Sequence, residues 1–91
     1  MDYQKEFKRV LHTKTPHCFL GKYGITEDFI QHVTKLLKRY KVIKIKALKT
    51  SAVKSNIKEI ASEIAKLTDS HLLDLRGRIF IISLNPIKGN N

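Results

Sequence analysis

The sequence predicts a two-layer α/β domain in which the elements follow the order α-β-α-β-α-β-β around a four-stranded mixed sheet. Three observations predict this fold. Apolar residues recur every three or four positions over residues 25–40, which is the spacing of one helical face. Within residues 41–48, Ile43 and Ile45 alternate with Lys44 and Lys46, as in a half-buried strand. Residues 71–84 form two apolar runs around Gly77, which predicts a hairpin.

The first predicted element is a short helix over residues 3–12, which we expect to pack on the rest of the domain. Its apolar side chains share one helical face: Tyr3, Phe7, Val10 and Leu11. Residues 13–17 (TKTPH) end this helix, because Pro16 disfavours a helical conformation in the residue before it. A short apolar strand is then expected over residues 17–20.

A glycine turn over residues 21–24 (GKYG) leads from this strand into the longest predicted helix, which ends near residue 40. Thr26 is a good N-cap, because its hydroxyl can accept a hydrogen bond from the first helical turn. Glu27 and Asp28 then lie at the positive end of the helix dipole. The apolar face of this helix comprises Ile25, Phe29, Ile30, Val33, Leu36, Leu37 and Tyr40.

The glycine turn has two interpretations. Without a Cβ at Gly21 and Gly24, the backbone can approach a phosphate closely. Lys22 would add a positive charge to such a site, and Tyr23 a ring that can stack on a base or ribose. A turn from strand to helix also needs glycine for its geometry, and GxxG matches are common by chance. In isolation the stretch favours a plain turn, and it is the rest of the chain that favours a phosphate site.

Residues 41–48 (KVIKIKAL) form the second predicted strand. Ile43 and Ile45 alternate with Lys44 and Lys46, so one face is apolar and the other carries two lysines. We therefore expect helices on one face of the sheet and a partly basic open face on the other.

A polar connection over residues 49–55 leads to a second long helix, expected over residues 53–68. Strands over residues 71–75 and 78–84 follow, joined by a tight turn at Gly77. The buried stripe predicted for the helix consists of Ile57, Ile60, Ala61, Ile64 and Leu67.

Length and composition favour one domain over residues 1–91, with a core over about residues 3–84 and a flexible tail over residues 85–91. No run of residues approaches the roughly 20 apolar residues of a membrane helix. The first residues carry charges and lack the apolar run of a signal peptide. We therefore expect a cytoplasmic protein without a membrane partner.

Charge is the most informative property of the composition. The chain has 18 Lys and Arg residues against 8 Asp and Glu residues, a formal net charge of +10. This excess favours a polyanionic partner, with nucleic acid preferred over a merely solvated lysine-rich surface. Residues 35–58 contain no acidic residue. Their basic residues are Lys35, Lys38, Arg39, Lys41, Lys44, Lys46, Lys49, Lys54 and Lys58.

The sequence offers no catalytic or metal-binding pattern, so we expect neither an enzyme nor a cofactor. Cys18 is the single cysteine, which excludes an intrachain disulfide, and no Cys/His spacing resembles a zinc site. His17 precedes Cys18, but neighbours in a strand point to opposite faces, and a strand cysteine is more often a small buried apolar residue. His12, His32 and His71 lie in separate elements.

The element order, together with LGKYGITEDFIQHV (residues 20–33) and VIKIKAL (residues 42–48), resembles the CRM domain (chloroplast RNA splicing and ribosome maturation), specifically its free-standing YhbY-type members. The hairpin LRGRIFI (residues 75–81) matches the family's glycine-turned hairpin, so the resemblance spans about residues 3–84. It implies a fold similar to the C-terminal domain of translation initiation factor three, with a glycine loop resembling that of KH domains. Bacterial stand-alone members associate with precursors of the large ribosomal subunit. The resemblance thus implies an RNA partner, ribosomal RNA or its precursor in a pre-ribosomal particle, and a role in ribosome assembly or maturation.

The basic residues then predict a binding surface in three parts. N–H groups of the glycine loop would hold a phosphate, and lysines on the open sheet face would follow the RNA backbone. Arginines beside the hairpin turn would extend this patch if that turn lies near the loop. The predicted RNA-binding residues are Gly21, Lys22, Tyr23, Gly24, Lys44, Lys46, Lys49, Arg76 and Arg78.

Three alternatives remain open at this point: a DNA-binding or nucleoid protein, a basic module that meets an acidic protein, and a small RNA-processing enzyme. The helix cations Lys35, Lys38 and Arg39 are interpreted as a solvated face. We expect the protein to act as a monomer.

Overall fold

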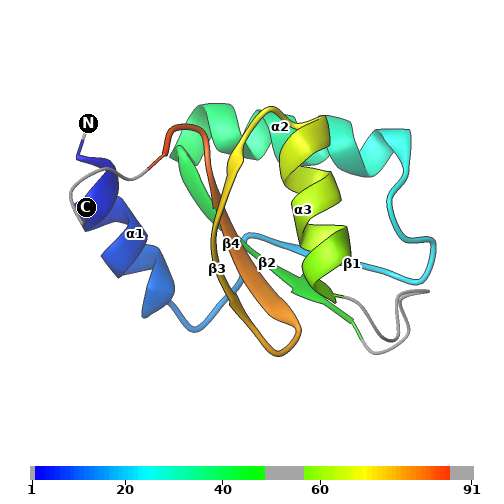
Figure 1. Cartoon of the computed structure of the whole chain (residues 1–91), viewed down its shortest axis with the longest axis horizontal. Helices are drawn as coiled ribbons and strands as arrows, with labels where there is room; N and C mark the ends of the chain where they lie inside the picture. The colour runs from blue at the N-terminus through cyan, green and yellow to red at the C-terminus, as the bar shows by residue number, and fades with distance from the viewer. Residues whose placement is uncertain (1, 49–56, 87–91) are drawn as a thin grey trace.

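The computed structural model describes residues 2–48 and 57–86, and it confirms the predicted order of elements (Figure 1). The elements are α1 (Tyr3–Leu11), β1 (Cys18–Leu20), α2 (Glu27–Tyr40), β2 (Val42–Ala47), α3 (Ile57–Leu67), β3 (His71–Arg76) and β4 (Ile79–Ser83). The predicted connection over residues 49–55, the predicted start of the helix at residue 53 and the last residues of the predicted tail lie outside the described residues.

The four strands form one mixed sheet in the order β1-β2-β4-β3. β1 runs parallel to β2, with Cys18 opposite Ile45 and Leu20 opposite Ala47. β4 is antiparallel to both of its neighbours, β2 and β3. The register of β3 and β4 shifts between Leu72 and Asp74. The mixed sheet is therefore as the sequence predicts.

The main core lies between one face of the sheet and the two longer helices. Val33 and Leu37 from α2 and Ile64 from α3 are buried with Ile45 of β2 and Phe80 of β4. Full burial of an aliphatic or aromatic side chain of this size contributes about 1.5–3 kcal/mol. These residues recur at the spacings expected of one helical face and one strand face, which is why the sequence identifies them.

One member of the predicted α3 stripe is wrong, because Leu67 is 51% exposed. Leu67 lies seven positions after Ile60, which is itself only partly buried, so both residues are at the margin of the stripe. The buried positions at this end of α3 belong to Ala65 and to Thr68, whose hydroxyl donates to the carbonyl of Ile64 at 2.7 Å.

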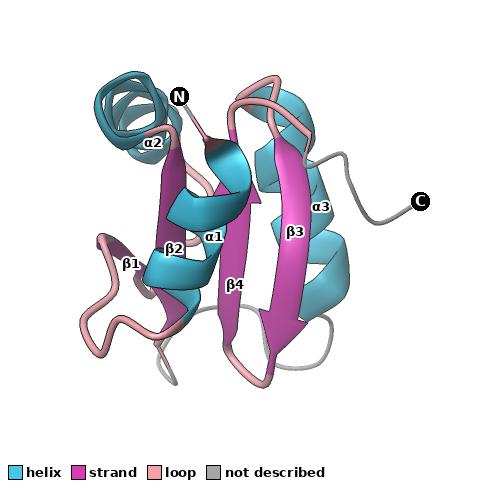
Figure 2. Cartoon of the chain, turned by 90° about the vertical axis from the view of Figure 1, so that its left-hand side faces the viewer, coloured by secondary structure: helices cyan, strands magenta, loops and turns pink. Residues whose placement is uncertain are grey.

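A second, smaller core lies on the opposite face of the sheet. There Val10 of α1 is buried against Val42 of β2 and Ile81 of β4, with Phe7 and Leu73 packed around them. Figure 2 shows α1 in front of β2 and β4, with α3 behind the sheet. The expectation of a basic face left open by the helices was therefore wrong for the part of the face under α1. An amphipathic helix needs an apolar surface, and α1 finds it there.

Candidate nucleic-acid interface

The topology brings three predicted parts of the site to one end of the sheet, which we call the loop edge. It comprises residues 20–24, 46–48 and 76–79. β1 and β2 are parallel and both end here, and antiparallel β4 begins here. The Ala47 N–H donates to the Arg78 carbonyl at 2.8 Å, and the Leu48 N–H donates to the Leu20 carbonyl at 2.9 Å. The glycine loop and the hairpin turn thus lie at the same end, separated by β2 (Figure 1).

The two glycines of the loop differ in what requires them. Gly24 has a φ of +69°, in the left-handed region that favours glycine, and its N–H donates to the Gly21 carbonyl at 3.1 Å. Gly21 has no such φ, and a Cβ built on it meets no atom within 4 Å. Neither backbone conformation nor packing therefore requires glycine at position 21. Because glycine has no side chain, the backbone at this position is unobstructed.

The tip of the loop presents both donors and side chains to solvent. Within the residues that the structure describes, the N–H groups of Lys22 and Tyr23 donate to no partner. The Tyr23 side chain is 80% exposed, and the Lys22 ammonium lies 5.2 Å from its ring centroid. An exposed cation–π contact of this kind contributes about 0.5–1 kcal/mol. The loop therefore offers two free N–H groups next to one charge and one ring.

The N-terminus of α2 is poorly suited to an anion. Thr26 caps the helix as predicted, and its hydroxyl accepts from the Phe29 N–H at 3.1 Å. Glu27 and Asp28 follow in the first turn, so two carboxylates already lie at the positive end of the dipole. An incoming phosphate would be repelled by them. The loop N–H groups, and not the first turn of the helix, are the donors left for it.

Lys44 is not on an open surface, which corrects the sequence-based expectation. Its side chain is buried, and its ammonium donates to the carbonyls of Leu11 at 3.1 Å and Thr13 at 2.6 Å. These carbonyls lie at the C-terminal end of α1, where the helix leaves acceptors without partners and the dipole favours a cation. Lys44 therefore fixes α1 to the sheet and presents no charge to a ligand.

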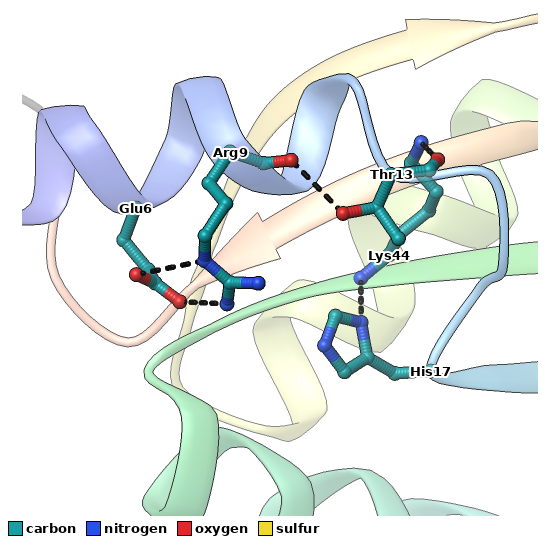
Figure 3. A network of polar contacts seen from close by, with 5 residues as sticks. All are labelled: Glu6, Arg9, Thr13, His17 and Lys44. Carbon is teal, nitrogen blue, oxygen red and sulfur yellow. Dashed lines mark hydrogen bonds and ion pairs between the residues drawn. The ribbon is translucent and has the colours of Figure 1, made fainter.

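The backbone of Lys44 is held by His17, as Figure 3 shows: the Lys44 N–H donates to the His17 Nδ1 at 3.0 Å. This bond requires an unprotonated Nδ1. Burial lowers the pKa of His17, and the nearby Arg9 guanidinium lowers it further, while Glu6 opposes them. The ring also lies 5.0 Å from the Tyr40 ring, measured between centroids. His17 is thus a neutral structural residue.

The other predicted cations differ in how free they are. Lys46 is exposed, whereas Lys49 lies outside the described residues. Arg76 is exposed and pairs with Asp74, with 3.2 Å between Nε and Oδ2. Arg78 is half-buried, and its guanidinium donates to the Leu48 carbonyl at 3.2 Å. Lys46 and Arg76 can therefore reach a ligand more freely than Arg78, part of whose guanidinium holds the end of β2.

Phe19 is the residue at this edge that the sequence-based prediction missed. It lies in a run of three apolar residues, yet 49% of it is exposed because its neighbours Cys18 and Leu20 face the core. Strict application of the two-residue period of a strand to this run would have placed Phe19 on the opposite face.

Other kinds of site find little support in the geometry. Over residues 2–48 and 57–86, no group of three or more His, Cys, Asp or Glu side chains could hold a metal ion. Burial raises the pKa of the Cys18 thiol to about 12, so it carries almost no thiolate at neutral pH. None of the helices in the described part of the chain has the length and apolar character to span a bilayer.

Comparisons with known proteins agree with the fold. The family model for the CRS1 / YhbY (CRM) domain matches residues 2–82. Among solved structures, a hypothetical protein from Staphylococcus aureus, for which RNA binding has been proposed, is 28% identical in sequence. The similarity covers 100% of this chain and 93% of that one, with a TM-score of 0.69. A search of curated proteins found no match.

Proposed function

The chain belongs to the CRS1/YhbY (CRM) domain family, and on that premise we propose that it binds RNA through the loop edge. We propose further that the RNA is structured ribosomal RNA or its precursor, and that the protein acts in ribosome assembly or maturation in the cytoplasm as a monomer. The family and the RNA binding proposed for the similar staphylococcal protein support the first statement.

One observation carries the proposal. Gly21 is a glycine for which the fold itself gives no reason, and it lies beside the free N–H groups of Lys22 and Tyr23. A residue without a Cβ next to unused backbone donors suits the close approach of a phosphate oxygen. The exposed ammonium groups of Lys22 in the loop and Lys46 on β2 supply electrostatic attraction at this edge.

The chemistry of this edge favours recognition of the RNA backbone. The N–H groups of Lys22 and Tyr23 would bind one phosphate, while Lys46 and Arg76 would contact neighbouring phosphates. Lys46 on β2 and Arg76 on β3 are two strand spacings apart, about 10 Å. Lysine and backbone N–H groups carry no base code, so the shape of the RNA and its unpaired segments would decide where the protein binds.

Salt dependence tests RNA binding as such. If about four to six phosphates of a single-stranded segment are contacted, log affinity against log salt should have a slope of about −3 to −4. Fluorescence anisotropy with a labelled fragment of ribosomal RNA measures this slope. A decaglutamate peptide and a DNA duplex of equal length are the controls. A slope near zero would contradict the proposal, and peptide binding as tight as RNA binding would instead favour an acidic protein partner.

Gly21→Ala tests the phosphate contact without disturbing the fold. We expect the melting temperature to stay unchanged or to rise slightly, because the backbone at position 21 suits alanine. RNA affinity should fall, because a methyl group would stand where a phosphate approaches. Lys22→Ala is the matched variant that removes charge, and it should also lower the salt slope by about 0.7. If Gly21→Ala binds RNA like the parent, the loop is only a turn.

The ribosomal part of the proposal needs RNA from cells. Ultraviolet crosslinking of the protein in its own cells, followed by sequencing of the attached RNA, should enrich precursors of ribosomal RNA. Enrichment of messenger or transfer RNA instead would contradict the ribosomal role and leave RNA binding intact.

A further inference from the structure

The strand register places four residues in one row across the loop end of the sheet. Phe19 on β1 is opposite Lys46 on β2, Lys46 is opposite Ile79 on β4, and Ile79 is opposite Arg76 on β3. Paired residues on neighbouring strands point to the same face. We call this row the platform row.

The platform row lies on the face that α1 covers only in part. α1 packs on Val42 and Ile81, and its C-terminal end is held by Lys44, two residues before Lys46. Beyond Lys44 the face is accessible: Phe19 is 49% exposed, Lys46 is exposed, and the Arg76 side chain is 74% exposed. The row thus begins where the helix stops.

The exposed residues in and beside the row are unusual for a surface that contacts only solvent. Among the described residues, the exposed large apolar side chains are Phe19, Tyr23 and Leu67. Single exposed apolar residues are normal on protein surfaces and do not by themselves indicate a binding site. Here, however, two of the three are aromatic rings, and they lie on either side of Gly21 on a chain of net charge +10. Rings interleaved with cations are the composition that binds single-stranded nucleic acid.

We propose that the platform row binds an unpaired RNA base, which stacks on the ring of Phe19 while Lys46 and then Arg76 contact phosphates farther along the same strand. This inference rests on the proposed RNA binding and deepens it by naming the ligand as a single-stranded segment, such as a loop or bulge of a structured RNA. Phenylalanine has no hydrogen-bonding group, so the contact is tolerant of base identity. Arg76 keeps guanidinium N–H groups beyond the one that pairs with Asp74.

The position of Phe19 links the platform row to the glycine loop. Two strand residues span about 7 Å, so Phe19 and Gly21 lie within the reach of adjacent nucleotides. A phosphate at the Lys22 and Tyr23 N–H groups and a base on Phe19 can therefore belong to one short stretch of RNA. A second copy of this chain is a poor occupant of the row, because two surfaces of strongly positive charge repel each other.

The test compares two probes that carry the same phosphates. One is a labelled decamer of oligoriboadenylate, and the other is a decamer of abasic ribose phosphates, both at one fixed salt concentration. Phe19→Leu removes the ring and keeps an apolar side chain, and Phe19→Trp keeps a ring. Phe19→Leu should weaken binding of oligoriboadenylate by roughly 5-fold or more and leave the abasic decamer unchanged. Phe19→Trp should bind both probes at least as well as the parent.

The outcomes separate this inference from the proposed function. A parent protein that binds the ribosomal RNA fragment but neither decamer overturns the platform row alone, whereas a parent that binds none of the three overturns RNA binding as well. A parent that binds oligoriboadenylate, with Phe19→Leu binding equally well, overturns the platform row alone. Equal losses on both probes also overturn it, since stacking cannot explain the loss on an abasic chain. A measurement on the parent avoids any folding defect: the Phe19 ring protons should shift on addition of oligoriboadenylate and stay in place with the abasic decamer.

Discussion

Lys44 and Lys46 lie two residues apart on β2 and point to the same face of the sheet, yet their surroundings differ completely. Lys44 is buried under the end of α1, and both of its neighbouring acceptors are backbone carbonyls. Lys46 lies one step beyond the helix and is exposed beside Phe19. Strand alternation determines the face of a side chain, but the helix that covers this face decides whether the lysine supports the fold or can meet a ligand.

The largest effect expected from this contrast is on stability. Lys44→Met keeps most of the side-chain volume and removes the ammonium, so the carbonyls of Leu11 and Thr13 lose their partner. We expect the free energy of unfolding to fall by about 1–3 kcal/mol. Lys46→Met, the matched control on the exposed side, should stay within about 0.5 kcal/mol of the parent. Chemical denaturation measures both, and equal stabilities would contradict the assigned role of Lys44.

RNA affinity should show the opposite ranking of the two variants. Lys46→Met should lose one charge-assisted phosphate contact, about 1–2 kcal/mol of binding free energy. Lys44→Met should bind like the parent when it is measured well below its own melting temperature. Isothermal titration with the ribosomal RNA fragment measures both variants under the same salt. Loss of affinity in folded Lys44→Met would mean that its charge reaches the ligand after all.

The smallest effect concerns pH, and it tests the bond between His17 and the Lys44 backbone. Because burial and Arg9 lower the pKa of His17 in the folded protein, the unfolded chain binds a proton first as the pH falls. Stability should therefore be complete above the ordinary pKa of about 6.5 and should decline below it until the lowered pKa is reached. His17→Gln should remove this part of the pH dependence. The same decline in that variant would assign the effect to another group.

Much of the fold follows from periodicity in the sequence. The spacing of Phe29, Val33 and Leu37 is that of one helical face, and the turn at Gly77 separates two strands, as the structure confirms. Helix caps can also be predicted from the sequence, because Thr26 caps the first turn of the helix that directly follows it. These features depend on residues close to each other in the chain, so the sequence contains what determines them.

The site is less predictable because it depends on contacts between distant segments. Nothing near Lys44 in the sequence indicates that Leu11 and Thr13 will accept from its ammonium. Phe19 looks like a core residue until the sheet order makes β1 an edge strand whose outer face α1 leaves uncovered. Leu67 follows the helical period, but it lies at the margin of the stripe. In each case the sequence predicts the face on which the side chain lies, whereas contacts between distant segments decide whether that side chain is covered.

The burial of the single cysteine makes local opening of this protein measurable by thiol labelling. Cys18 faces the main core from β1, a strand of three residues with one hydrogen-bonded neighbour, and its other side carries Phe19. A thiol reagent reaches the buried sulfur when the core around this strand opens, so the labelling rate reports how often this part of the molecule opens. A ligand held between Phe19 and the glycine loop would keep the strand closed. The labelling rate of this one native thiol therefore measures how often the edge at which we expect RNA to bind opens.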